Sequence, residues 1–224
     1  MENIRMALFD VDNTLVYGRK AKVFYKNYSR LLEESFAKAL GVELFEGKKI
    51  VDLHRAKYHG AGEKVFETYQ LGMEVWYDAL LALNPEKYLE SLPVSNKVLG
   101  ALKREGIILG AITDGPRPLV DKIFNATDID ASQFDFIIGW ERGLPMPKSG
   151  SGAIYEKVLK KNKVPKEFVV MTGDSLLDDI LPAVSVGLRA IHISSEKAVD
   201  EKEYLTLRNI RPLTNLKKLR KRLG

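Results

Sequence analysis

The sequence predicts an α/β protein that is built on a parallel sheet and carries a small all-helical unit. After residue 93, short apolar runs alternate with segments of helical periodicity. This alternation is typical of strand–helix–strand units, which form a parallel sheet covered by helices on both faces. Between a single apolar run near the N-terminus and residue 93, apolar residues recur at helical spacing alone. The helical unit is therefore expected as an insertion after the first strand.

The first strand is expected in the stretch ALFDVDNTL at residues 7–15. Its apolar run ends in two carboxylates, Asp10 and Asp12, with Thr14 behind them. Two carboxylates at the end of a buried strand do not serve packing, because an unpaired buried charge costs several kcal/mol. The stretch therefore indicates that a cation lies beside these two side chains.

Helices are expected in the segment that follows, over residues 22–40, 48–58 and 63–83. Gly41 is a natural stop for the first of them, and Asn84 with Pro85 breaks the pattern of the third. The chain thus divides into a core, formed by residues 1–15 and 93–224, and a helical unit of residues 16–92.

The remainder of the chain supplies the other strands and the helices that cover them. Strands are expected over residues 107–112, 136–138, 168–171 and 189–193. Helices are expected over residues 95–104 with Ser95 as the cap, after Pro116, and over residues 152–161 and 176–186. In such a sheet the ligand lies beyond the carboxyl ends of the strands, so functional residues are expected there.

Polar side chains follow three of these strands. They are Asp10 and Asp12 after the first strand, Thr113, Asp114 and Gly115 after the second, and Asp174, Asp178 and Asp179 after the strand FVVM, with Lys148 in the turn-rich segment GLPMPKSGSG. Oxygen ligands alone suit Mg²⁺, which usually binds one or two carboxylates and a substrate phosphate. One carboxylate can attack phosphorus, while the metal and the lysine neutralise charge and the hydroxyl and backbone N–H groups hold the phosphoryl oxygens.

This ordered set of motifs resembles the haloacid dehalogenase superfamily of hydrolases, essentially end to end. DVDNT at residues 10–14 is similar to its first motif, Thr113 to its second, Lys148 to its third and GDSLLDD at residues 173–179 to its fourth. The resemblance implies a Rossmann-like catalytic core (the fold of that superfamily), a helical cap domain inserted after the first motif, and Mg²⁺ as the cofactor.

The resemblance also implies roles for individual residues. Asp10 would be the nucleophile that forms an aspartyl-phosphate, and Asp12 would be the general acid for the leaving group and then the base for water. Thr113 and Lys148 would complete the catalytic set, with Lys148 steadying Asp10. The phosphoryl group would be bound by Thr113, Asp114, Gly115 and Lys148.

By the same resemblance, three residues would ligate Mg²⁺. These are Asp10 and Asp174 through their carboxylates and Asp12 through its main-chain carbonyl. Asp179 would lie behind these ligands as the second acid of the fourth motif. Asp178 stands where the family often has Asn, and it is expected to act as an N-terminal helix acid or in a secondary role.

Two positions depart from the family pattern. Lys148 is followed by Ser149 where many relatives have Pro, and Thr113 is followed by Asp114 where Asn is common. The second departure adds a negative charge near the phosphate. Neither departure removes a group that the mechanism needs.

The leading hypothesis is a Mg²⁺-dependent phosphatase that acts on a small phosphorylated metabolite. The alternatives are a phosphomutase of the β-phosphoglucomutase type and a non-catalytic phosphate-binding protein. A dehalogenase is disfavoured by Asp12, because that reaction needs neither a metal nor an acid two residues after the nucleophile. A pure binding protein is disfavoured, because binding alone gives no reason to cluster several carboxylates whose negative charge is not balanced.

Substrate-contacting residues are harder to identify. Arg117, just after the second motif, is the residue outside the motifs that we expect to contact substrate. Within the helical unit the candidates are cations, histidines and a tyrosine, and an exposed helix position is the commoner explanation for each: Tyr17, Arg19, Lys20, His54, Arg55, Lys57 and His59. Trp76 and Trp140 are expected in the hydrophobic core.

Charge and composition exclude several other functions. Residues 204–224 hold seven basic side chains and no acidic one, so subtracting them from the net charge of +5 leaves the rest of the chain at −2. Leucines recur at helical spacing in this tail, which favours a docked helix with a solvated basic face over a nucleic-acid site. No cysteine, signal peptide or membrane-length apolar run is present. A cytoplasmic protein without nucleic-acid or membrane partners is expected, and the sequence does not indicate its oligomeric state.

Overall fold

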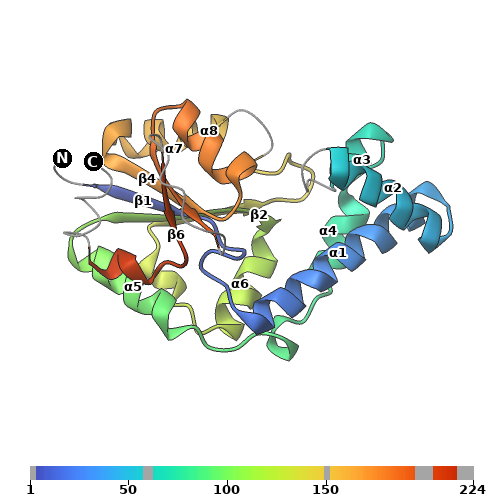
Figure 1. Cartoon of the computed structure of the whole chain (residues 1–224), viewed down its shortest axis with the longest axis horizontal. Coiled ribbons are helices and arrows are strands. Elements are labelled where there is room, and N and C mark those ends of the chain that lie inside the picture. The colour runs from blue at the N-terminus through green and yellow to red at the C-terminus, as the bar shows by residue number, and fades with distance from the viewer. Residues whose placement is uncertain (1–3, 58–62, 149–151, 195–203, 216–224) are drawn as a thin grey trace.

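The computed structural model describes residues 4–57, 63–148, 152–194 and 204–215 (Figure 1). At its centre is a six-stranded sheet in the order β3-β2-β1-β4-β5-β6, in which every pair of neighbours is parallel. The strands are β1 (Met6–Phe9), β2 (Ile108–Pro116), β3 (Phe136–Trp140), β4 (Val169–Gly173), β5 (Arg189–Ile193) and β6 (Tyr204–Leu207).

Strand β1 is the central element, paired with β2 on one side and β4 on the other. Its four residues are all buried, as expected where both faces of a parallel sheet are covered. Phe9 is level with Ala111 in β2 and with Thr172 in β4. The carboxyl ends of the three central strands therefore meet at one edge.

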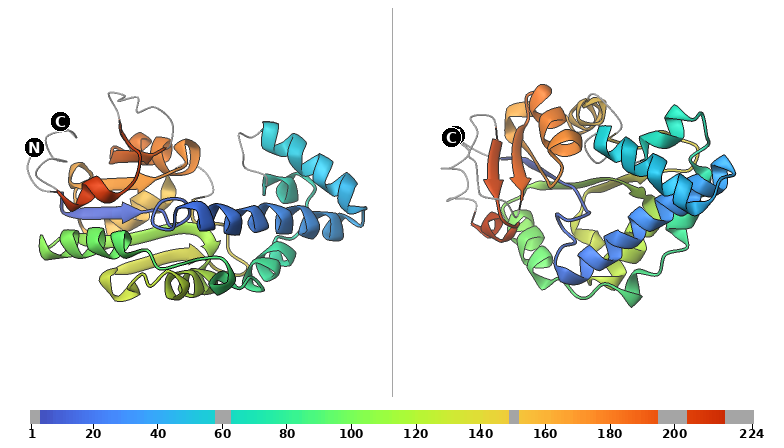
Figure 2. Two further views of the ribbon diagram at one scale, coloured as in Figure 1. Left: turned by 60° about the horizontal axis from the view of Figure 1, so that its bottom comes forward. Right: turned by 45° about the vertical axis from the view of Figure 1, so that its right-hand side comes forward.

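Helices cover both faces of the sheet, as Figures 1 and 2 show. Successive side chains of a strand point to opposite faces: Ala7 and Phe9 belong to one hydrophobic cluster, and Met6 and Leu8 to the other. The first cluster includes, among others, residues of α5 (Pro93–Arg104), α6 (Arg117–Ala126) and the short η5 (Arg211–Thr214). The second cluster includes residues of α7 (Ala153–Asn162) and α8 (Leu181–Ser185). The predicted α/β fold is thereby confirmed.

The segment between β1 and α5 is helical and extends beyond the carboxyl ends of the strands (Figure 2). Its elements are α1 (Arg19–Leu40), α2 (Leu44–Lys57), α3 (Lys64–Thr68), α4 (Glu74–Leu81) and the short η1 (Pro85–Lys87). Helix α1 ends at Gly41 in the left-handed conformation, with φ of 75°, as predicted. Tyr77 of α4 packs on Trp140 of β3 with ring centroids 4.8 Å apart, so the helical segment contacts the core.

One predicted helix is wrong. Residues 63–83 form two helices, α3 and α4, because the chain turns at residues 69–73, where Gln70 has a left-handed φ of 54°. Positions ten residues apart in a continuous helix would be about 15 Å apart. The turn instead stacks the Phe66 and Trp76 rings, with centroids 6.4 Å apart. Burying both rings together therefore outweighs continuation of the helix.

The predicted cap at Ser95 is also wrong, because α5 begins two residues earlier with Pro93 as its first residue. Ser95 lies inside the helix, and its hydroxyl donates to the carbonyl of Leu15 at 2.8 Å. Proline suits this first position, because its fixed φ is helical and its missing N–H is not needed there. Ser95 therefore ties α5 to the end of the first motif.

Three further elements differ from expectation. Strand β2 continues to Pro116, the fourth motif forms a π-helical turn (Leu176–Ile180, η4) before α8, and β6 was not predicted. In the tail, Leu213 lies in η5, and the helix expected beyond it falls mostly on residues 216–224, outside the described residues. No helix in the described residues is long and apolar enough to cross a membrane.

Candidate active site at the carboxyl ends of the central strands

The first motif leaves β1 in a sharp turn. The N–H of Asp10 donates to the carbonyl of Thr172 at 2.9 Å, which continues the sheet by one residue. Asn13 then adopts a left-handed φ of 58°, a conformation that Asn tolerates better than most residues. The N–H of Leu15 donates back to the carbonyl of Val11. This turn holds the Asp10 and Asp12 side chains at the edge where the strands end.

Lys148 joins the first motif to the fourth. Its ammonium group binds Oδ1 of Asp10 directly and Oδ1 of Asp179 at 2.7 Å. The three side chains are almost wholly excluded from solvent, at 6% exposed for Lys148, 5% for Asp10 and 0% for Asp179. One buried cation thus faces two buried carboxylates, and the cluster keeps an excess of negative charge.

The pKa values in this cluster follow from burial and charge. Burial raises the pKa of Asp10 well above its usual value; Lys148 opposes this shift, and the neighbouring carboxylates add to it. Burial works against the charge on Lys148, but Asp10 and Asp179 outweigh it, so the pKa of Lys148 is also raised well above its usual value. The two neighbouring carboxylates therefore favour the charged form of the lysine.

Asp114 fixes the backbone around Lys148. Its Oδ1 accepts a hydrogen bond from the main-chain N–H of Lys148 at 2.7 Å. The position needs an acceptor, which a carboxylate supplies as well as the amide common in the family. The departure at Asp114 is thus compatible with an ordered loop before Lys148, whereas Ser149 lies outside the described residues.

Thr113, the residue of the second motif, contacts Asp12. Its hydroxyl accepts from the N–H of Gly115 at 3.0 Å and donates to Oδ2 of Asp12 at 3.4 Å. In this structure Gly115 therefore orients the threonine hydroxyl. Burial raises the pKa of Asp12, and hydrogen bonding lowers it in part.

The fourth motif is ordered by two acids with different surroundings. Oδ2 of Asp179 accepts from the N–H of Ser175 at 3.1 Å, and Asp178 exchanges hydrogen bonds with Ser175 at 2.7 and 3.1 Å on the exposed side. A Cβ on Gly173 would lie inside contact distance of the Asp179 carboxylate. Tyr155, which the motifs do not include, donates to the carbonyl of Asp179 at 3.2 Å.

Carboxylate oxygens of Asp10, Asp174 and Asp179 lie within 4.8 Å of one another. Burial and the neighbouring Asp179 raise the pKa of Asp174 to about 7. Oδ2 of Asp10 and Oδ1 of Asp12 are buried and have no hydrogen-bond partner in the described part of the chain. Clustered, unpartnered carboxylate oxygens fit a hard divalent cation. Asp179 was expected behind the metal ligands, and the structure places it among the three carboxylates.

The candidate residues outside the motifs have other partners. Arg117, the first residue of α6, pairs with Asp121 one turn along the helix. Arg55 pairs with Glu33 and Asp52 on the helical segment. Lys20 pairs with Glu90 at 2.9 Å, and His59 is outside the described residues.

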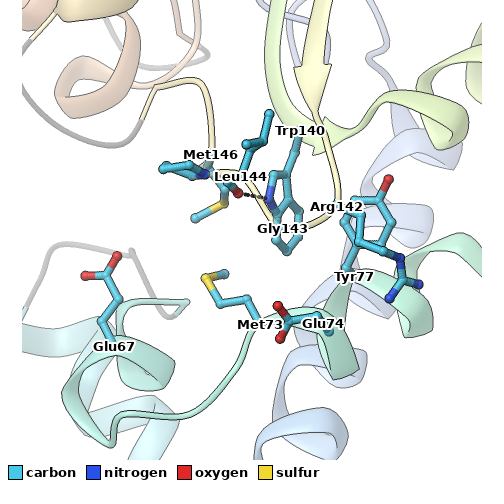
Figure 3. Close-up of a pocket in the computed structure, with 10 residues that line it drawn as sticks. Glu67, Met73, Glu74, Tyr77, Trp140, Arg142, Gly143, Leu144 and Met146 are labelled. Carbon is cyan, nitrogen blue, oxygen red and sulfur yellow. Dashed lines mark hydrogen bonds between the residues drawn. The ribbon is translucent and has the colours of Figure 1, made fainter.

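A cavity of ≈ 200 Å³ lies between the loop after β3 and helices α3 and α4 (Figure 3). Trp140 forms part of its wall and donates from its indole N–H to the carbonyl of Leu144 at 2.8 Å. Trp140 and Trp76 are both buried, with ring centroids 5.7 Å apart. The expectation that both tryptophans belong to the core is confirmed.

Comparison with known proteins identifies the family of the chain. Haloacid dehalogenase-like hydrolases match residues 4–187. A glyceraldehyde 3-phosphate phosphatase from Pyrococcus furiosus is 31% identical over 221 residues, covering 91% of this chain and 88% of the relative.

Solved structures show the same fold. A haloacid dehalogenase-type phosphatase from Thermococcus onnurineus has a TM-score of 0.65 at 21% identity, covering 95% of this chain and 97% of that one. A putative β-phosphoglucomutase from Thermotoga maritima has a TM-score of 0.58 at 19% identity, covering 96% of this chain and 99% of that one. With its four motifs gathered at one edge of the sheet, the chain belongs to the haloacid dehalogenase-like hydrolases, as a member of their phosphatase branch.

Proposed function

We propose that this phosphatase hydrolyses a small phosphorylated metabolite through an aspartyl-phosphate on Asp10. The observation that carries the proposal is the asymmetry of the Asp10 carboxylate. Oδ1 is held by Lys148, whereas the buried Oδ2 has no hydrogen-bond partner in the described residues. A fixed carboxylate with one uncommitted oxygen in a solvent-excluded site is suited to nucleophilic attack.

The reaction then needs two proton transfers, and Asp12 would serve in both. When an Asp10 oxygen bonds to phosphorus, the bond from phosphorus to the ester oxygen breaks, and the leaving oxygen takes the proton of Asp12. Water then attacks the aspartyl-phosphate and gives a proton back to Asp12, which releases phosphate and restores Asp10. Burial raises the pKa of Asp12, and a raised pKa favours a carboxyl group that carries a proton to donate.

Thr113 and Lys148 would bind the phosphoryl group. The Thr113 hydroxyl is fixed by Gly115, and the Lys148 ammonium group supplies a positive charge in direct contact with Asp10. Asp114 would act through the backbone of Lys148. Donors and cations fixed in advance in a buried site stabilise charge at the reacting group without reorganisation.

Mg²⁺ would be held by the carboxylates of Asp10 and Asp174 and by the main-chain carbonyl of Asp12, with Asp179 beside them. When bound, the metal would neutralise charge on these carboxylates and on the phosphoryl oxygens. The donor set fits this ion because it consists of oxygen atoms only, with three carboxylates in reach of one another.

Residues 16–92 would act as the cap that selects the substrate. Helix α1 begins seven residues after Asp12, so the helical segment is attached directly to the first motif. The Pyrococcus relative is named for glyceraldehyde 3-phosphate, which makes a three-carbon phosphate the first substrate to test. A substrate this small does not require the extended basic surface that binds a long polyanion such as a nucleic acid.

The test is release of inorganic phosphate from glyceraldehyde 3-phosphate and from a panel of small phosphate esters, with Mg²⁺ and with a chelator. Asp10→Asn should abolish release while the circular dichroism spectrum stays unchanged. Asp52→Asn, on the exposed surface of α2, is the matched control and should retain activity. Unchanged turnover in Asp10→Asn would contradict the mechanism. Isomerisation of a sugar phosphate without net release of phosphate would favour the phosphomutase.

A further inference from the structure

Two tyrosines of α1 direct their hydroxyl groups into the site. Tyr25 and Tyr28 are three residues apart, so they lie on the same face of the helix. Both residues are partly exposed, yet their hydroxyl oxygens are buried and have no hydrogen-bond partner among the residues that the structure describes. Neither belongs to a motif of the catalytic core.

Aromatic packing fixes both rings. Phe24, fully buried, contacts Tyr25 and Tyr28 edge to face, with centroids 5.3 and 5.5 Å apart, and the two tyrosine rings are 5.6 Å from each other at 66°. Edge-to-face contacts of this kind are favourable and directional. The hydroxyl groups are therefore held in place by their own rings, before any ligand arrives.

The Tyr28 hydroxyl lies near Asp12 and Thr113. A Cβ built on Gly115 would be 3.7 Å from the Tyr28 hydroxyl oxygen, 3.7 Å from Oδ2 of Asp12 and 3.3 Å from the Thr113 hydroxyl oxygen. These three groups therefore surround one small space above Gly115. The absence of a side chain on Gly115 keeps that space open.

Tyr25 interacts with Asp12 more closely. Its hydroxyl lowers the pKa of Asp12, against the larger effect of burial. It does so without a hydrogen bond of normal distance and angle in this structure. Burial, with the charge of Asp12, raises the pKa of Tyr25 and of Tyr28 well above the usual value. A tyrosine hydroxyl has an ordinary pKa of about 10 and keeps its proton at neutral pH, so both hydroxyls can act as hydrogen-bond donors.

The unpartnered groups complement one another. Oδ1 of Asp12 is a buried acceptor without a partner in the described chain, and the hydroxyl groups of Tyr25 and Tyr28 are buried donors in the same condition. Each such group costs about 1–3 kcal/mol when it stays unsatisfied. Small movements that bring a tyrosine O–H onto the carboxyl group of Asp12 recover this energy.

We infer that Tyr25 and Tyr28 are positioning residues: their hydroxyls orient the carboxyl group of Asp12 for transfer of its proton to the leaving oxygen. The inference rests on the proposed phosphatase mechanism. The proton moves from Asp12 to the ester oxygen as the bond from that oxygen to phosphorus breaks, and the tyrosines keep their own protons. Helix α1 thereby contributes to proton transfer as well as to covering the site.

The test compares two leaving groups. An alkyl phosphate such as glyceraldehyde 3-phosphate must have its leaving oxygen protonated, whereas the 4-nitrophenolate of 4-nitrophenyl phosphate leaves without a proton. In Tyr25→Phe, kcat/KM for the alkyl ester should fall by about 10-fold or more, and for the aryl ester by less than about 3-fold. In Tyr28→Phe, kcat/KM should likewise fall more for the alkyl ester than for the aryl ester.

Tyr88→Phe is the matched control. Its ring packs on Phe24 in the same aromatic group, with centroids 6.0 Å apart, but its hydroxyl is not one of the three atoms nearest to the space above Gly115. In this variant, kcat/KM should stay unchanged for both the alkyl ester and the aryl ester. An equal loss for both esters in Tyr25→Phe, or no loss for either, would overturn the inference.

Thermal unfolding gives an independent readout. Because the Tyr25 and Tyr28 hydroxyls have no partner in the free protein, replacing either tyrosine by Phe should leave Tm unchanged or raise it. A marked fall in Tm would show a structural role and would overturn the inference. The proposed function is tested separately by phosphate release in the wild type, and absence of release from both esters would overturn that function and the inference with it.

Discussion

The ammonium group of Lys148 binds the Asp10 carboxylate in a site closed to solvent, and the same ammonium group holds Asp179 at 2.7 Å. This relationship joins the ends of β1 and β4 through a loop that belongs to neither strand. It also leaves one oxygen of Asp10 uncommitted. The ion cluster therefore stabilises the strand edge and, in the proposed mechanism, holds Asp10 ready for attack on phosphorus.

Replacing Lys148 by Met should show both effects. Two buried carboxylates would lose their cation, and breaking a buried pair costs about 3–5 kcal/mol. Turnover should fall by about 10²–10³-fold, because a fixed positive charge at the reacting group is lost. Urea unfolding and phosphate release measure the two effects. Lys103→Met removes the exposed pair with Asp135 and should cost no more than about 1 kcal/mol; equal costs for the two variants would contradict the burial argument.

Replacing Gly173 by Ala should displace Asp179. The added Cβ would overlap the Asp179 carboxylate. This carboxylate is held in place by hydrogen bonds from Ser175 and Lys148, so moving it would break those bonds. We expect Mg²⁺ affinity or turnover to fall by about 10–100-fold, the usual effect of disturbing a group next to metal ligands. Titration of activity with Mg²⁺ measures this change.

Gly100→Ala is the control for that substitution. Gly100 lies inside α5, where an added Cβ would be 3.5 Å from its nearest neighbours, an ordinary contact. The variant should gain about 0.5–1 kcal/mol of stability from the lower flexibility of the unfolded chain, with unchanged Mg²⁺ dependence. An unaltered Mg²⁺ titration in Gly173→Ala would show that Asp179 does not act near the metal.

The stability of the metal-free protein should fall as pH rises from about 4 to about 7. Burial raises the pKa of Asp174 from 3.8 to about 7 and that of Glu63 from 4.5 to about 7. In this window the folded state binds more protons than the unfolded state, so unfolding becomes easier as pH rises. Thermal unfolding in a chelator across this range measures the slope.

Two comparisons separate the two acids. Glu63→Gln should remove part of the slope, because the amide does not titrate. Mg²⁺ requires deprotonated carboxylates, so the rise in Tm that Mg²⁺ produces should be larger at pH 8 than at pH 6. A metal-induced shift that is the same at both pH values would contradict a titrating carboxylate at the metal site.

The strand-end motifs can be predicted from the sequence, because the apolar run of each strand and the polar residues that follow it are adjacent in the chain. An apolar run marks a buried strand, and a parallel sheet brings the ends of its central strands to one edge. The sequence alone therefore predicts that Asp10, Thr113 and Asp174 lie together, and Lys148 joins them through its place in the order of the motifs. The contacts that tune these residues are not readable in this way, since the contact between Lys148 and Asp114 joins residues 34 positions apart.

What the sequence did not reveal depends on packing between distant segments. Tyr25 and Tyr28 read as ordinary helix residues, because nothing in their spacing says that α1 turns that face toward Asp12. The turn at Gln70 is set by the stacking of Phe66 on Trp76, which no local propensity encodes. The YLTL strand at residues 204–207 is short, and the leucine spacing of the following tail suggested a helix instead.

Ser95 offers the sharpest test of these long-range contacts. Its side chain is fully buried inside α5, and its hydroxyl donates to the carbonyl of Leu15 at 2.8 Å across 80 positions of the chain. Ser95→Ala would leave that buried carbonyl without this donor, so it should lower the free energy of unfolding by about 1–3 kcal/mol. Ser132→Ala, which removes an exposed hydroxyl bonded to Asp130, should cost less than about 1 kcal/mol. Urea unfolding measures both values, and a Ser95→Ala cost as small as that of Ser132→Ala would mean that the contact does not anchor the first motif to α5.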